Sequence, residues 1–181
     1  MKKEFSKLPF RKGVGIVLIN KENKVFVGKR IDNPMDFWQM PQGGVDENED
    51  YLKAALRELK EETSIENVDL IKELEEMTTY ELPDHLLGII WRGKYRGQKQ
   101  KWFLMKFKGK DAEINLNTNH PEFLDWKWIN VDEITKLLRS EEKKVSENIL
   151  KQTKSNNMRE IINKVNKDRE SGFRSYVEYI E

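Results

Sequence analysis

The chain lacks cysteine, and this absence excludes several kinds of chemistry. Without thiols it can form no disulfide, supply no thiolate to a metal and use no cysteine nucleophile. Proteins without disulfides are typical of reducing compartments. We therefore expect a cytoplasmic protein.

Net charge and long apolar runs are nearly absent as well. The 33 Lys and Arg residues almost cancel the 32 Asp and Glu residues, so no overall field favours DNA or an anionic membrane, and any nucleic acid would have to bind a local patch. No stretch approaches the roughly 18 apolar residues of a membrane span. The basic start, MKKEFSKLPFRKG, lacks the apolar core of a secretory signal. We expect neither membrane nor DNA as a partner.

The hydrophobic pattern predicts an α/β (α+β) fold. Extended segments are predicted at 13–20, 24–28, 70–80, 101–107 and 123–129. The first two, joined by a turn at 21–23, form a predicted hairpin. Two prolines and a Gly pair make 31–44 a predicted loop, with at most a short strand near 38–40. A helix is expected to open at Asp132, a residue suited to the N-cap.

The clearest predicted helix covers residues 49–62, where Leu52, Ala55, Leu56 and Leu59 share one stripe at helical spacing. From residue 140 onward the chain is highly charged and helical in pattern. With 181 residues, the chain suits a single domain with a small appendage. We predict a domain over 1–155 and a C-terminal helical tail over 156–181 that packs on the domain or contacts a protein partner.

Carboxylates crowd one side of the predicted helix. At about 100° per residue, Glu58, Glu61 and Glu62 project within roughly a third of its circumference, beside the apolar stripe. A solvated helix face with pairs such as Arg57 and Glu61 would explain the composition without any function. However, carboxylates at the edge of a core repel one another unless a cation or a proton lies between them. Mg²⁺ accepts carboxylate oxygens and completes its shell with substrate phosphates, so the cluster favours phosphate chemistry.

The spacing of this segment resembles the Nudix box. Gly43 is followed by Glu49 after five residues and by RELKEE (57–62) after seven more, and Ile65 completes the pattern. Ser64 stands where the motif has Gly, at a turn where glycine relieves left-handed strain. The segments FRKGVGIVL, FWQMPQGG, YELP, WRGKYRGQKQKWF and HPEFLDWKW are similar to the bacterial RNA pyrophosphohydrolase and dinucleoside polyphosphate hydrolase branch.

The resemblance implies a fold and a set of site residues. The fold is a mixed β-sheet sandwiched between helices. A divalent metal, Mg²⁺ or alternatively Mn²⁺, would be bound by Gly43, Glu58, Glu61, Glu62 and Glu122. The catalytic roles would fall to Glu58 or Glu122 as general base, with Arg57 orienting the carboxylates; Gly44 and Glu49 would be structural.

Substrate contacts are also implied by the resemblance. The residues expected near the polyphosphate or the 5′ nucleotide are Arg11, Arg30, Gln39, Tyr80, Gln98 and Lys101. Independently, residues 91–102 interleave cations with aromatic side chains. This pattern favours a surface that binds phosphates and bases over the alternative of a charged loop leading into a strand. The family's aromatic residue near the start of the C-terminal helix has no counterpart in LRSEEKKVSEN.

Three functions follow as expectations. The first is a metal-dependent enzyme that removes pyrophosphate, or successive phosphates, from 5′-triphosphorylated RNA and leaves a 5′-monophosphate. The second is hydrolysis of dinucleoside polyphosphates such as diadenosine tetraphosphate at the same site. The third, a catalytically silent nucleotide- or RNA-binding module, is disfavoured because mutually repelling carboxylates destabilise a fold that binds no metal.

Overall fold

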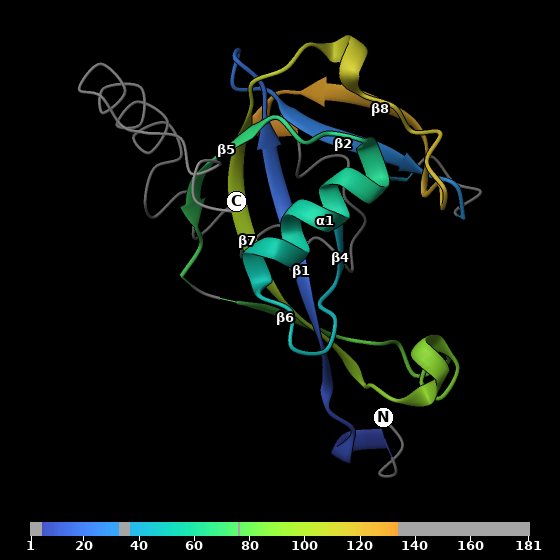
Figure 1. Ribbon diagram of the computed structural model, residues 1–181. Helices are drawn as coiled ribbons and strands as arrows, with labels where there is room; N and C mark the ends of the chain where they lie inside the picture. The colour runs from blue at the N-terminus through green and yellow to red at the C-terminus, as the bar shows by residue number, and fades with distance from the viewer. Residues whose placement is uncertain (1–4, 33–36, 76, 134–181) are drawn as a thin grey trace.

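A computed structural model describes residues 5–32, 37–75 and 77–133 (Figure 1). The helical pattern predicted from residue 140, the domain end at 155 and the tail at 156–181 all lie outside these residues. The described part is one sheet with one α-helix, α1 (Tyr51–Thr63), packed across it.

The sheet contains eight strands. They are β1 (Phe10–Ile19), β2 (Val25–Arg30), β3 (Trp38–Gln39), β4 (Gln42–Gly44), β5 (Val68–Glu73), β6 (Thr78–Glu81), β7 (Gly97–Phe107) and β8 (Phe123–Ile129). The main order is β3-β2-β1-β7-β5, while β4 pairs with β1, β6 with β7 and β8 with β2. β1 and β7 run parallel from Phe10 beside Gly97 to Ile19 beside Lys106, and the other pairs are antiparallel. The prediction of a mixed sheet is confirmed.

The structure also refines the predicted strands. The hairpin of β1 and β2 is present, and the side chain of Asn20 closes its turn by accepting hydrogen bonds from the backbone N–H groups of Glu22 and Lys24. The predicted strand at 70–80 is two strands, β5 and β6, which both pair with β7. The predicted loop at 31–44 contains β4 as well as the short β3, because the Gly pair lies flat against β1.

Helix α1 begins and ends at residues suited to those positions. The Asp50 carboxylate accepts hydrogen bonds from the N–H groups of Leu52 and Lys53, which satisfies two donors at the helix start. Ser64 ends the helix in the left-handed region, with φ of 62°. The structure therefore places a serine in the backbone conformation that usually favours glycine. Its hydroxyl donates to the carbonyl of Asn115 at 2.9 Å.

Four short 3₁₀ helices complete the described part: η1 (Phe5–Lys7), η2 (Ile90–Gly93), η3 (Asp111–Glu113) and η4 (Val131–Glu133). The helix predicted to open at Asp132 is represented here by η4 alone, since the residues after 133 are outside the described part. Among the described residues, no helix has the length and apolar character needed to cross a membrane.

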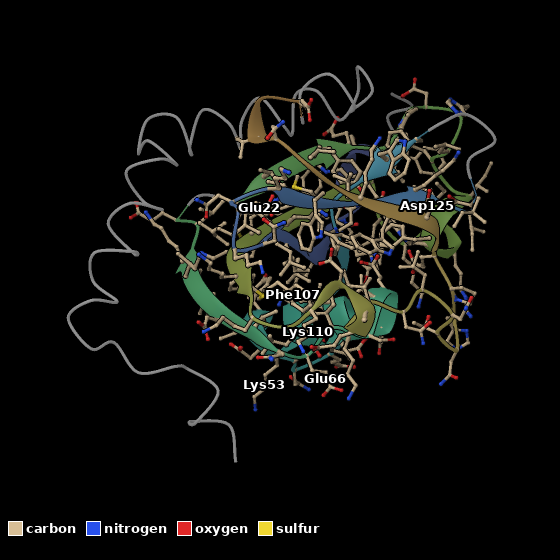
Figure 2. All side chains as sticks on the ribbon, turned by 90° about the horizontal axis from the view of Figure 1, so that it is seen from above. Glu22, Lys53, Glu66, Phe107, Lys110 and Asp125 are labelled. Atoms are coloured by element: carbon tan, nitrogen blue, oxygen red, sulfur yellow. The ribbon has the colours of Figure 1, made fainter. Side chains whose placement is uncertain are left out.

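Apolar side chains pack on both faces of the sheet. The face under α1 buries Ala55 and Leu59 of the helix against Ile16, Phe103 and other strand residues. A second cluster, which includes Trp38, Trp102 and Leu104, forms on the other face. Figure 2 shows Lys53 and Glu66 pointing outward on the side of α1, whereas Phe107 lies inside. The core thus fixes α1 against β1 and β7 while one flank of the helix faces β4.

Candidate active site

The acidic flank of α1 meets the two glycines of β4. Arg57 organises this contact, because its guanidinium donates to the carbonyl of Gly44 at 2.9 Å and to both carboxylate oxygens of Glu49 at 2.8 Å. It also donates to Glu58 and Glu61, each at 3.0 Å. One cation therefore ties the glycine strand, the connecting loop and two carboxylates of the helix together.

Glu49 is the most firmly ionised carboxylate of this group. Its side chain accepts two bonds from Arg57 and one from the backbone N–H of Asp46 at 2.9 Å. Hydrogen bonding to Arg57, with a smaller contribution from the Asp46 N–H, lowers the pKa of Glu49 to about 2. These contacts tie the loop before α1 to Arg57 of the helix, and the structural role of Glu49 stays a prediction.

Glu58 lies directly against Gly43. A Cβ atom on residue 43 would stand 1.9 Å from the Glu58 carboxyl carbon, so the absence of a side chain is what allows the carboxylate to occupy this position. Burial raises the pKa of Glu58, and the proximity of Glu61 adds to the rise, while Arg57 opposes it. The carboxylate is thus held against the glycine pair of β4, and Arg57 does not fully offset the effect of burial on its pKa.

Glu62 is the most unusual residue of the cluster. Its side chain is only 1% exposed. Its Oε2 accepts a bond from the Gln42 N–H at 3.1 Å, while its Oε1 is buried and has no hydrogen-bond partner among the described residues. Burial, followed by the charges of Glu122 and Glu58, raises the pKa of Glu62 well above its usual range. A buried carboxylate oxygen without a donor needs either a proton or a cation.

Glutamine side chains support Gln42 beside this carboxylate. Gln100, which is 1% exposed, donates from Nε2 to Gln42 Oε1 at 2.8 Å. Gln42 in turn donates to Gln39 Oε1, which also accepts a bond from Arg30 at 3.0 Å. Gln42 and Gln100 were missed from the sequence. Gln42 stands beside the Gly pair, but nothing in the sequence shows that residue 100 meets it.

The residues predicted to bind substrate fall into two groups. Arg11, Tyr80 and Gln98 lie on the Gly43–Gly44 side: a Cβ atom on Gly44 would be 2.0 Å from the Arg11 guanidinium, and Gln98 connects the Tyr80 hydroxyl with the Gly43 carbonyl. The second group lies beside Glu62 or further away. It consists of Arg30, Gln39 and Lys101.

Within the second group, Arg30 is shared between Gln39 and the carboxylate of Asp32. Lys101 is directed elsewhere, because its ammonium lies 2.7 Å from the carboxylate of Glu73. The structure therefore brings most of the predicted residues to one region around β4 and the flank of α1, with Lys101 paired outside it.

The donor set fits a divalent cation. Within the described residues, no three carboxylate or imidazole groups are already gathered as a complete metal cage, and both Glu58 and Glu61 bond to Arg57. The fit rests instead on the unpartnered Glu62 oxygen and on the charges of Glu58 and Glu122 around it. Hard oxygen donors of this kind match Mg²⁺ and related ions, which retain water and accept phosphate oxygens.

The geometry together with the sequence identifies the class of protein. The NUDIX domain family matches residues 9–151. The chain therefore belongs to the Nudix family of hydrolases, whose members generally use divalent metals.

Two individual relatives within this family have the same name. A Pelagibacter ubique (strain HTCC1062) protein called RNA pyrophosphohydrolase is 67% identical over 131 residues, which cover 72% of this chain and 83% of that protein. A Sphingopyxis alaskensis protein of the same name is 52% identical and covers 75% of this chain and 87% of its own length.

Solved structures give the same fold. The E. coli dihydroneopterin triphosphate pyrophosphohydrolase is 25% identical with a TM-score of 0.61, over 77% of this chain and 96% of that one. A C. elegans Ap4A hydrolase in a binary complex is 26% identical with a TM-score of 0.55, over 77% of this chain and 94% of that one. The mixed sheet and its helix are therefore the Nudix arrangement.

Proposed function

We propose that this chain hydrolyses the 5′ phosphoanhydride bonds of triphosphorylated RNA with Mg²⁺, leaving a 5′-monophosphate and releasing pyrophosphate or successive phosphates. Metal-dependent hydrolysis is supported above all by the buried Glu62 carboxylate, whose Oε1 has no hydrogen-bond partner in the described part of the chain and whose neighbours Glu58 and Glu122 are also acidic. The RNA substrate is supported by the 67% identity to the Pelagibacter RNA pyrophosphohydrolase. Such an enzyme would act on RNA ends in the cytoplasm.

The proposed metal ligands are the Gly43 carbonyl and the carboxylates of Glu58, Glu61, Glu62 and Glu122. When bound, Mg²⁺, or Mn²⁺ in its place, supplies charge neutralisation for the phosphate chain and lowers the pKa of a coordinated water. Arg57 would orient Glu58 and Glu61, the two carboxylates to which it donates. Release of those carboxylates toward the metal would leave Arg57 still anchored on Glu49 and Gly44.

The hydrolytic step requires a base. Glu58 would take a proton from the attacking water as its oxygen bonds to phosphorus, the P–O anhydride bond would break, and the leaving phosphate or pyrophosphate would keep the bond's electron pair. A carboxylate whose pKa is raised by burial suits this role, because a base works best when its pKa approaches the working pH. Glu122 is the second choice for the base.

Binding of the phosphate chain would use the cations and amides around β4. Arg11, Arg30, Gln39, Tyr80, Gln98 and Lys101 form the proposed set. Arg11 and Gln98 are supported most directly, since both lie against the glycine pair. Lys101, whose side chain is 15% exposed, would have to leave the more exposed carboxylate of Glu73 and form an ion pair with a phosphate instead.

A second candidate substrate is a dinucleoside polyphosphate of the diadenosine tetraphosphate type. It is favoured by the similarity to the C. elegans Ap4A hydrolase and by the cation-rich segment 91–102. The same metal ligands and base would serve either substrate, because both contain phosphoanhydride bonds.

In the test, the purified protein is incubated with Mg²⁺ and one of two substrates in separate reactions. The substrates are a short 5′-triphosphorylated RNA and diadenosine tetraphosphate. Chromatography would identify the products, and Glu61→Gln is the inactive control. The proposal predicts 5′-monophosphorylated RNA as the faster product. It is wrong if the RNA stays intact while the dinucleotide is cleaved, and the metal role is wrong if removal of divalent ions leaves both rates unchanged.

A further inference from the structure

The segment between β6 and β7 holds one tryptophan in an uncommon backbone conformation. Trp91 has φ of 51° and Arg92 has φ of 58°, and Gly88 and Gly93 also have positive φ. Side-chain-bearing residues rarely adopt this region, and strain of this kind clusters at functional sites. Figure 1 shows the segment, in yellow-green, projecting from the sheet at the end where β1 begins.

Trp91 is separate from the core, unlike the other tryptophans. Trp38 and Trp102 belong to one apolar cluster, and Trp126 and Trp128 pack against the other, but Trp91 is in neither. Its ring is half-buried, and the neighbouring Ile89 is 70% exposed. Packing of the described core therefore does not account for this side chain.

The ring of Trp91 contacts two other side chains of the segment and of β1. The guanidinium carbon of Arg11 lies 5.3 Å from the ring centroid, a distance at which a cation is attracted to an aromatic face. Tyr95 meets Trp91 edge to face, with 6.3 Å between centroids and 76° between planes. These contacts fix the plane of the indole beside a cation.

Arg11 links this ring to the proposed metal site. Its guanidinium also lies against Gly44, since a Cβ atom there would be 2.0 Å from Nη2. Gly44 in turn bonds to Arg57, the residue that holds Glu58. A phosphate chain bound at Glu58 and Glu62 would therefore reach Arg11 first and the indole next.

Positively charged side chains near Trp91 in the sequence favour a ligand that carries phosphates. Arg92, Lys94 and Lys99 are all exposed near the indole in sequence, and none of these three shares an ion pair among the described contacts. An aromatic face flanked by cations binds a nucleotide through stacking of the base and attraction of its phosphates.

We propose that Trp91 is a stacking platform for a nucleobase, namely the base of the 5′-terminal nucleotide whose phosphates occupy the proposed metal site. The proposal rests on the proposed function for the identity of that nucleotide. Stacking recognises the π face that every base presents, so the platform accepts any base and holds the larger purines more tightly than pyrimidines.

The first experiment compares two RNA substrates of the same sequence, both 5′-triphosphorylated, one of which lacks the first base. Trp91→Leu keeps an apolar side chain but removes the aromatic face. We expect it to lower kcat/KM on the intact RNA about tenfold, mainly through KM, and to leave the rate on the abasic RNA unchanged. Trp91→Phe should retain most of the preference for the intact RNA.

The matched control is Ile89→Ala, which truncates an exposed side chain two residues away and should not change either rate. Equal slowing of Trp91→Leu on intact and abasic RNA would overturn the proposal, because the indole would then act only through Arg11 or the fold. Equal rates of the unaltered protein on the two RNAs would overturn it too.

A binding measurement separates this proposal from the proposed function. Intrinsic tryptophan fluorescence would be followed while a 5′-monophosphorylated dinucleotide is added, with Trp91→Phe as the comparison. Quenching that disappears in Trp91→Phe supports the platform even if no triphosphorylated RNA is hydrolysed. Hydrolysis of the RNA together with equal quenching in both proteins would overturn the platform and leave the proposed function intact.

Discussion

The carboxylates at the two ends of the acidic cluster differ in their environment. Those around Arg57 form the paired end, and Glu62 forms the unpaired end. Around Arg57, near the middle of the helix, charges are paired: Glu49 accepts three hydrogen bonds and has a pKa of about 2. Further along the helix, Glu62 is 1% exposed and has a raised pKa, and one of its oxygens has no partner within residues 5–32, 37–75 and 77–133. The same residue type is thus found in two opposite environments, paired in the loop before α1 and unpaired near the end of the helix.

The two ends therefore have opposite effects on the stability of the metal-free protein. A paired carboxylate stabilises the fold by itself, whereas a buried carboxylate without a partner destabilises the fold until a proton or a cation arrives. The paired end can therefore be tested by stability alone, and the unpaired end by the response of stability and activity to metal.

The largest effect is expected from Glu62→Gln, which removes the unpaired charge. Hydrolysis should fall roughly 10³-fold, because a metal ligand that contributes several kcal/mol in the transition state is lost. The melting temperature of the metal-free protein should rise, since a neutral amide avoids the buried charge, and the further rise on adding Mg²⁺ should shrink. Thermal unfolding with and without Mg²⁺ measures both.

The stability of the metal-free protein should also change with pH in a defined direction. Because the pKa of Glu62 is raised on folding, the unaltered protein should lose stability as pH rises from about 4.5, the unfolded value, through the raised value. Glu62→Gln should remove that part of the loss. Glu66→Gln, at an exposed position paired with Lys60, is the matched control. If Mg²⁺ raised the melting temperature of Glu62→Gln as much as that of the unaltered protein, the unpaired carboxylate would not be the group that responds to the metal.

The next effect is expected from Gly43→Ala, which tests the contact between the glycine strand and the helix. The new Cβ would stand 1.9 Å from the Glu58 carboxyl carbon, so the carboxylate must move. A displacement of about 1 Å can lower a rate by about 10²-fold. In Gly109→Ala the new Cβ meets the exposed Glu113 carboxylate at 2.3 Å instead. Steady-state rates of the two variants should differ strongly; similar rates would show that the position of Glu58 is not limiting.

A smaller effect, on stability, is expected from Glu49→Gln at the paired end. Loss of the charge-assisted bonds to Arg57 should lower the free energy of unfolding by about 1–2 kcal/mol at pH 7, discounted for partial exposure. The pKa of Glu49 falls from 4.5 to about 2 on folding, so its contribution is complete above pH 4.5 and is lost as pH falls toward 2. Urea unfolding at pH 7 and at pH 3 should show the deficit shrinking. A deficit that is constant across pH would mean that the ion pair is not its source.

The smallest effect is expected from Ser64→Gly, at the turn that follows the unpaired end. Glycine relieves the positive φ, which should stabilise the protein by up to ~1 kcal/mol, but it also removes the hydroxyl bond to Asn115. The net change should be within about 1 kcal/mol and independent of Mg²⁺. A variant that binds Mg²⁺ more weakly would show that the helix end and the metal response are coupled.

Local spacing predicted much of the fold. The helix at 49–62 differs from α1 by only a residue or two at each end, and β8 coincides with the predicted 123–129, because both have clear periodicity and clear ends. β4 could not be predicted from propensity, since a Gly pair becomes a strand only through its partner β1. The division of 70–80 into β5 and β6 likewise depends on how each pairs with β7.

The candidate site was predictable only in part for the same reason. Helical spacing placed Glu58, Glu61 and Glu62 together, but it could not separate the buried Glu62 from the more exposed Glu61, since burial depends on what packs against the helix. Gln100 and Trp91 come to the site from distant segments of the chain. Their contacts with Gln42 and Arg11 exist only in the folded sheet.

The parallel pairing of β1 with β7 has a consequence for the order of folding. β1 has the first residues of the sheet, and its parallel partner begins at Gly97, so the chain must be synthesised almost to the end of β7 before this pair can close. Long-range parallel pairs form slowly because the entropy of closing a long loop is lost before any contact compensates for it. Helix α1 can form early, but the two strands on which it packs, β1 and β7, come together only when this late pair has formed. A nascent chain therefore carries the motif well before it can act.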